Sequence, residues 1–189
     1  MTERNTLLRS AHDLGLAAWF GGSLMGAVGV NGAAEQEGGT RLDTARIASA
    51  GWAKWAPLGA LAIGTHLVAG SGLLIANGGR VRHQAGVGAS TLAKLGLTGV
   101  ALAATAYTRA LGKKVELDSS DDAEDREAAQ EIPVGTTRAQ RQLTLMQWVV
   151  PGLTAGLVVL NALHGEQQRP GQQTLGVLRK MAPGSTRGA

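Results

Sequence analysis

Three long stretches of the chain contain no Asp, Glu, Lys or Arg, and this feature limits most strongly what the chain can fold into. The stretches are residues 14–34, 55–79 and 142–165. Each reaches the roughly 20 residues that an α-helix needs to cross the hydrocarbon core of a bilayer. An amphipathic helix of a water-soluble protein would instead carry a charge every third or fourth residue. The sequence therefore predicts membrane-spanning helices.

A fourth uncharged stretch, residues 95–108, is shorter than the other three. It becomes long enough when it is extended upstream to residue 89, provided that Lys94 snorkels toward a membrane face or meets a protein partner. We therefore expect an all-α fold, an integral membrane bundle of four transmembrane helices that forms a single membrane domain over residues 1–189. The spans are expected at about residues 11–31, 56–77, 89–110 and 143–164.

A water-soluble bundle rich in Ala and Gly is the competing interpretation, because the mean hydropathy is only +0.02. The polar residues, however, gather outside the spans. Residues 112–142 are expected to form an acidic, solvated loop, in which residues 119–127 can cap and begin a short helix that stops before Pro133. Residues 166–189 are expected to form a polar, basic tail outside the membrane.

Asn, Gly and Pro residues predict where the helices begin and end. The first span should end at Asn31 and Gly32 and the second at Asn77, Gly78 and Gly79, each closed by an Asn or Gly in the left-handed conformation. Residues 40–55 predict a short interfacial helix, or alternatively a plain amphipathic connector. Pro151 predicts a kink or a helix start inside the last span.

Composition excludes several classes of function. The net charge is +4, but the basic residues are scattered and not interleaved with aromatic residues, so we expect no nucleic-acid partner. Cysteine is absent, which excludes disulfide scaffolds, thiolate metal sites and cysteine nucleophiles. The spans contain no phosphate-binding loop, nucleophile elbow or carboxylate pair. We therefore expect no catalytic residues and favour a non-enzymatic protein.

Small residues recur at four-residue spacing inside the spans. Gly22 and Gly26 form such a pair in the first span, and Gly152 and Gly156 form another in the last. In lipid, small residues let helix backbones approach closely and gain dispersion contacts. These four glycines are therefore predicted to be helix-packing positions, either within one chain or between chains.

The histidines are the main candidates for chemistry within the membrane. His12 opens the first span, His66 lies near the middle of the second and His164 closes the fourth. They are candidate cofactor ligands, with haem b as the cofactor considered, because imidazole can ligate haem iron or pass protons. The alternative is structural: histidines solvated at helix ends, and a buried His66 bonded to Thr65, Ser71 or Asn161. No pair has helical i, i+4 ligand spacing, so no metal site is predicted.

One local pattern in the first span points to known families. His12 is followed by Trp19, Gly21 and Gly22, and this His-x6-Trp-x-Gly-Gly pattern resembles the first helix of the copper-resistance CopD-like and the HemJ-type protoporphyrinogen oxidase families. The resemblance implies that His12 matches a histidine regarded there as a haem or metal ligand and that Trp19, Gly21 and Gly22 pack. The whole chain, up to residues 161–173, is similar to four-span membrane proteins of actinobacteria.

Two functions from different classes follow. The first is a non-enzymatic integral membrane protein of structural or accessory type, whose partners are the lipid bilayer and a membrane-protein partner or a second copy of the chain. The second is a haem- or metal-binding membrane protein with a redox or transport role, using His12 with His66 or His164. The expected location is the cell membrane. Lys and Arg are divided evenly between the two sides, and the concentration of positive charge near the termini favours cytoplasmic termini.

Overall fold

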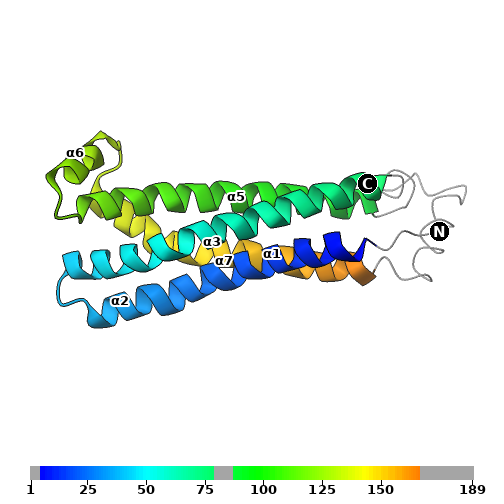
Figure 1. The fold of residues 1–189 in the computed structure, drawn as a ribbon, viewed down its shortest axis with the longest axis horizontal. Coiled ribbons are helices and arrows are strands. Elements are labelled where there is room, and N and C mark those ends of the chain that lie inside the picture. Colours follow the sequence, from blue (N-terminus) through cyan, green and yellow to red (C-terminus); the bar gives the residue numbers. More distant parts are fainter. Residues whose placement is uncertain (1–4, 79–86, 167–189) are drawn as a thin grey trace, which may run out of the picture.

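Four long helices run the length of the molecule in alternating directions (Figure 1). The structure, a computed structural model, describes residues 5–78 and 87–166, and within these ranges the chain forms helices and no strand. In chain order the elements are α1 (Thr6–Met25), the π-helical segment η1 (Gly26–Val30), α2 (Asn31–Glu37), α3 (Arg41–Ala76), α5 (Val87–Asp118), α6 (Ala123–Glu131) and α7 (Thr136–Glu166). The predicted all-α bundle is confirmed.

The four long helices are long and apolar enough to cross a membrane. Their outer faces carry large apolar side chains, and Leu61, Val68 and Ile75 of α3 are 67%, 74% and 84% exposed. Such a surface is stable when lipid surrounds it, since a soluble monomer rarely exposes a large continuous apolar patch. The protein is a multi-pass membrane protein.

Each of the four long helical segments, the first of which runs through α1, η1 and α2, is longer than the span predicted for it, and most of the additional residues lie at one end of the bundle. The 36 residues of α3 would measure about 54 Å, whereas the hydrocarbon core is about 30 Å thick. We call the end formed by α2, the start of α3, the end of α5, α6 and the start of α7 the helical cap (left in Figure 1). Ala45, Leu111, Val115 and Ala139 form its apolar core.

The predicted interfacial helix over residues 40–55 is wrong, because these residues are the first part of α3 and continue directly into the second span. Thr40 caps the helix by accepting a hydrogen bond from the backbone N–H of Asp43 at 3.2 Å. Pro57 lies inside α3 and does not begin it. The acidic segment 112–142 is largely helical and not an open loop, since α5 extends to Asp118 and α7 begins at Thr136.

Other boundaries differ from expectation for identifiable reasons. The first span does not end at Asn31, because the Asn31 amide bonds to Trp52 and Gln147 and needs no local turn. Asn77 does follow the end of α3, but its φ of −109° is not left-handed. Pro151 lies within α7 and starts no helix. The short acidic helix was predicted correctly: Asp122 caps α6, which ends before Pro133.

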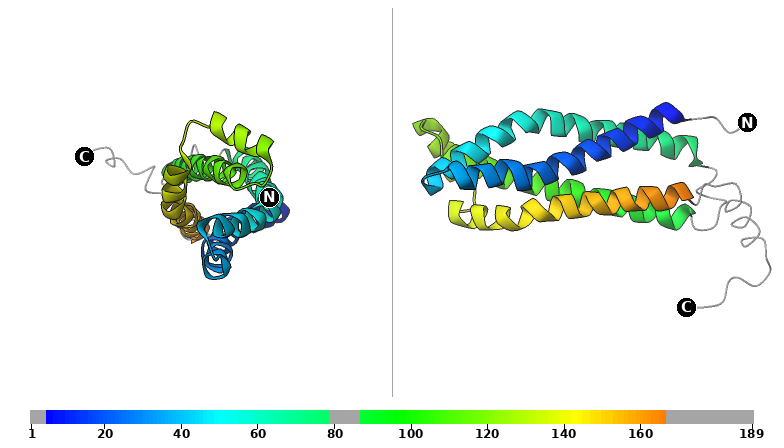
Figure 2. Two further views of the ribbon diagram at one scale, coloured as in Figure 1. Left: turned by 90° about the vertical axis from the view of Figure 1, so that its left-hand side faces the viewer. Right: turned by 90° about the horizontal axis from the view of Figure 1, so that it is seen from below.

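The bundle consists of two helix pairs. α1 packs mainly on α3 and α5 mainly on α7, and contacts between α1 and α7 join the pairs, whereas α3 and α5 touch much less (Figure 2). The core between the pairs contains Leu16, Trp19, Ala101 and Leu157. The indole N–H of Trp19 donates to the Thr105 hydroxyl at 3.2 Å, so the buried ring has the polar partner that it needs in lipid.

The predicted packing glycines contact other side chains in three of four cases. A Cβ at Gly22 or Gly26 would collide with the ring of Trp55 or Trp52, and one at Gly156 would approach Leu97. Gly152 has nothing within 4 Å of such a Cβ, so it makes no helix contact within the described chain. A close approach of two helix backbones lies at Gly15, which was not predicted. There a Cβ would lie 2.6 Å from the Ala62 carbonyl oxygen and 2.7 Å from the His66 nitrogen.

We predict that Gly15→Ala destabilises the protein while Gly21→Ala does not. A methyl at position 15 forces α1 and α3 apart, at a cost of about 1–3 kcal/mol for overpacking. Gly21 lies on the same helix with open space around it. Thermal unfolding in detergent should show a lower midpoint for Gly15→Ala alone. Equal midpoints for the two variants would contradict the close approach.

Candidate functional site: a polar cavity between the four spans

A cavity of about 500 Å³ lies between the four long helices. It is at the end of the bundle opposite the helical cap, where α1 and α5 begin and α3 and α7 end. We call it the polar cavity because seven lining residues carry charged, imidazole or amide groups: Arg9, His12, Asp13, His66, Asn77, Lys94 and Asn161. Its volume falls within the range of small-molecule sites, roughly 300–1,000 Å³.

Most of these polar groups lie inside the predicted spans, whereas Arg9 precedes the first span. At about 1.5 Å per residue, His12 is about 9 Å from the start of α1 and Lys94 is about 10 Å from the start of α5. His66 is about 15 Å from the end of α3. At such depths a polar side chain must find a protein partner or a water-filled cavity. The polar cavity therefore sets the environment of each group.

His12 and His66 lie face to face across α1 and α3. Their ring centroids are 4.1 Å apart with an interplanar angle of 32°, and the missing side chains of Gly15 and Gly70 provide the room. Trp19 approaches the far side of His66 edge-on, at 6.2 Å between centroids. His66 is only 4% exposed. It is held by packing on both sides while it lines the floor of the cavity.

The hydrogen bonds define the tautomer of each ring. Nδ1 of His66 lies 3.0 Å from the backbone oxygen of His12, and since a carbonyl can only accept, Nδ1 carries the proton. Nδ1 of His12 lies 3.0 Å from Oδ1 of Asp13, and an ionised carboxylate imposes the same tautomer. In both neutral rings Nε2 then has an unprotonated lone pair.

A second chain of hydrogen bonds joins the other helices. Nζ of Lys94 on α5 donates to Oδ1 of Asn161 on α7 at 3.0 Å. Nδ2 of Asn161 donates at 3.4 Å to Oδ1 of Asp13 on α1. Of the two alternatives expected for Lys94, a membrane face or a protein partner, the structure shows the second, because Asn161 offers it an acceptor within the bundle. The expected bonds of His66 to Thr65, Ser71 or Asn161 are replaced by the bond to the His12 carbonyl.

Of the three predicted ligands, the structure brings together His12 and His66. His164 belongs to the last turns of α7, and its side chain lies outside the described part of the structure. His83 lies outside the described residues altogether. Among the residues described, no group of three or more His, Asp or Glu side chains could hold a metal ion.

The two rings do not fit both axial positions of one haem iron. An imidazole nitrogen ligates a metal at about 2 Å, so two rings on opposite sides would have centroids about 6 Å apart. The observed 4.1 Å leaves no space for a porphyrin between them. One ring at most can act as a ligand in this arrangement. Its Nδ1–H bond to a carbonyl or carboxylate is the support that ligating histidines commonly have.

A second polar layer, which the sequence did not reveal, lies near the helical cap. Trp52 donates from Nε1 to Oδ1 of Asn31 at 2.9 Å, and Asn31 donates from Nδ2 to Oε1 of Gln147 at 2.8 Å. Asn31 directly follows η1, and π-helical segments are rare and often occur at functional sites. The useful sequence signal was the uncommon polar pair Asn31 and Gln147 within otherwise apolar stretches.

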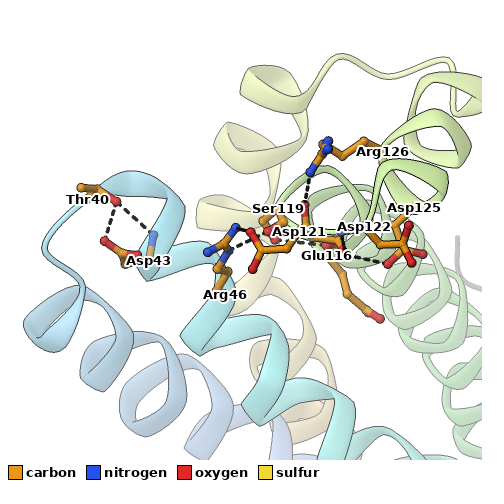
Figure 3. A network of polar contacts seen from close by, with 10 residues as sticks. Thr40, Asp43, Arg46, Glu116, Ser119, Asp121, Asp122, Asp125 and Arg126 are labelled. Carbon is orange, nitrogen blue, oxygen red and sulfur yellow. Dashed lines mark hydrogen bonds and ion pairs between the residues drawn. The ribbon is translucent and has the colours of Figure 1, made fainter.

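The helical cap has its own polar network, whose groups bond to one another (Figure 3). Arg46 donates from Nε to the Ser119 carbonyl at 2.8 Å and pairs with Asp121. Arg126 donates to the Ser120 carbonyl at 2.8 Å, and the Ser120 hydroxyl donates to Asp125 at 2.7 Å. These contacts anchor the α5–α6 connection to α3. The depression beside them is about 270 Å³, smaller than the polar cavity, so we take the polar cavity as the candidate site.

Comparison with known proteins adds no relative. No protein family, no curated protein and no solved structure matches this chain.

The Lys94–Asn161 bond allows a direct energetic test. We predict that Lys94→Met and Asn161→Leu are coupled in a double-mutant cycle, because each removes one partner of the same bond. The coupling should be about 0.6 kcal/mol, with an upper range near 1.7 kcal/mol, as for other hydrogen bonds between membrane helices. Thermal or denaturant unfolding in detergent measures it. Strictly additive effects would contradict a direct bond.

Proposed function

We propose that this multi-pass protein is a non-enzymatic binding protein of the cell membrane, of accessory type, that holds a small ligand in the polar cavity. The observation that carries the proposal is the convergence of His12, His66, Lys94 and Asn161 from four helices on one cavity of about 500 Å³. A bundle that only had to fold would be expected to bury apolar side chains at these positions, since buried polar groups in a membrane are costly.

The lining also fits binding better than catalysis. Apolar walls with a few convergent polar groups are typical of ligand pockets. Three hydroxyl residues, Ser71, Thr91 and Thr98, line the cavity, and no described hydrogen bond joins one of them to a histidine as in an activated nucleophile. The polar groups bond mainly to one another and leave their remaining capacity, such as the Nε2 lone pairs and two donors of Lys94, for a ligand.

Haem binding is the second candidate, and the paired Nδ1–H bonds of His12 and His66 favour it. The ring separation supports a single histidine ligand and not the predicted pair. A role for His164, and the family resemblance of the His12–Trp19 pattern, stay part of this second proposal. Gly152, which faces outward from α7, supports close packing with a membrane-protein partner or a second copy.

We predict that the purified protein retains a small molecule and that Thr98→Phe removes it. Thr98 lines the polar cavity, so a phenyl ring there should occupy the space of the ligand. Val100 lies on the same helix with 55% of its surface exposed, and Val100→Phe is the matched control. Solvent extraction and mass spectrometry of protein purified in mild detergent provide the measurement.

The expected result is a near-stoichiometric molecule with wild type and Val100→Phe, and a loss of at least tenfold with Thr98→Phe. A wild-type protein free of any bound molecule, or equal retention in all three, contradicts the proposal. The absorption spectrum of the same preparations tests the second candidate. A Soret band that disappears in His66→Ala or His12→Ala supports haem, and a colourless protein from haem-supplied cells contradicts it.

For the orientation, we propose cytoplasmic termini, which place the helical cap on the outer face. The absence of Cys makes a clean test available. Glu127→Cys introduces one thiol on the exposed face of α6, and we predict that a membrane-impermeant maleimide labels it in intact cells as fully as in lysed cells. Labelling only after lysis would reverse the orientation.

A further inference from the structure

We propose that the ligand of the polar cavity is an amphiphile with an anionic head, a carboxylate or phosphate on an alkyl chain, whose head lies at Lys94 and whose chain leaves between α3 and α5. This inference rests on the proposed binding function and adds to it the chemical class and the direction of entry.

The charge of the lining favours an anion. Of the described residues that line the polar cavity, Arg9 and Lys94 are cations and Asp13 is the only carboxylate. Asp13 already has two partners, since it accepts from Nδ2 of Asn161 and from Nδ1 of His12. A cationic head would therefore meet the Lys94 ammonium and a carboxylate that is already bonded.

Lys94 is the group best placed to receive the head. Its ammonium has three donors, and the bond to Asn161 uses one of them. It lies within the cavity wall, half-buried, where a charge-assisted hydrogen bond is less weakened by water than at a surface. His12 and His66 lie on the neighbouring helices of the same cavity and add polar edges opposite α5.

The apolar walls favour an alkyl chain over a free anion. Leu67 and Leu74 of α3 and Leu95 of α5 line the cavity together with Leu157 and Val158 of α7. Leu74 and Leu95 are also 37% and 50% exposed. Because α3 and α5 contact each other much less than the paired helices do, the seam between them is the route by which the alkyl chain would leave the cavity.

A seam between two membrane-spanning helices faces the region that acyl chains occupy, so a lipid-like molecule can enter there sideways while its head moves to the polar groups. A small water-soluble anion would gain nothing from the leucine walls.

The test is equilibrium binding of radiolabelled oleate to the full-length protein in maltoside detergent. Dodecyl phosphate, oleyl alcohol, oleylamine, acetate and inorganic phosphate serve as competitors. We expect oleate to saturate one site, dodecyl phosphate to compete, and oleyl alcohol, oleylamine, acetate and phosphate to compete at least tenfold more weakly. Competition by acetate or inorganic phosphate as strong as that by dodecyl phosphate would identify a simple anion site and overturn the amphiphile.

Variants separate the charge from the fold. Lys94→Gln retains a donor for Asn161 and should lower the affinity for oleate at least tenfold. The affinity of Lys94→Arg should stay within about threefold of wild type. Lys113→Gln, an exposed lysine in the helical cap, is the matched control and should not change binding. If Lys94→Gln aggregates, competition by oleyl alcohol on the wild-type protein decides whether binding requires an anionic head. Unchanged oleate affinity in folded Lys94→Gln would overturn the assignment.

Failure here is distinguishable from failure of the binding function. If oleyl alcohol binds as tightly as oleate and Thr98→Phe abolishes both, the polar cavity still binds ligand and only the anionic head is wrong. If wild type binds no oleate while a different molecule co-purifies and is lost in Thr98→Phe, the ligand class is overturned and the site stands.

Discussion

The requirement that every polar group within a bilayer finds a partner governs the structure of this protein. Hydrocarbon offers no hydrogen bonds, so a histidine, a lysine and an asparagine within the spans must be served by other helices. As a result, four helices that are rich in small residues are joined by specific polar contacts. α1 meets α3 through His12 and His66, and α7 meets α5 and α1 through Asn161, which bonds to Lys94 and Asp13.

The same requirement explains why the two ends of the bundle differ. At the helical cap, charged residues are abundant and pair with one another, so Arg46 and Asp121 anchor a connection and leave little unmet bonding capacity. At the other end, few polar groups share a cavity with leucines. Their geometry leaves lone pairs and donors available. The two ends differ because a polar group in the helical cap has more hydrogen-bond partners within reach than a polar group in the polar cavity.

The sequence predicts the membrane spans well because length and lack of charge are local properties. It also predicts α6, since Asp122 and Pro133 mark its ends locally. It fails where a distant residue changes the outcome. Asn31 would normally end a helix, but Trp52 and Gln147 satisfy its amide and the helix continues. Lys94 would normally snorkel, but Asn161 on another helix provides an acceptor. His12 and His66 were both candidate ligands in the sequence. Their ring contact depends on the close approach of α1 to α3 at Gly15, which the sequence did not predict.

The π-helical segment η1 has a consequence for how the two ends of the first long helix relate. A π-turn takes up one residue more than an α-turn, and one residue of an α-helix corresponds to a rotation of about 100°. The stretch Gly26–Val30 therefore changes which residues of the following helix face the interior of the bundle. His12 before it and Asn31 after it can each point into the bundle although a regular helix would not align both. α1 and α2 thus differ in helical phase: α1 contributes residues to the polar cavity, and α2 contributes residues to the helical cap.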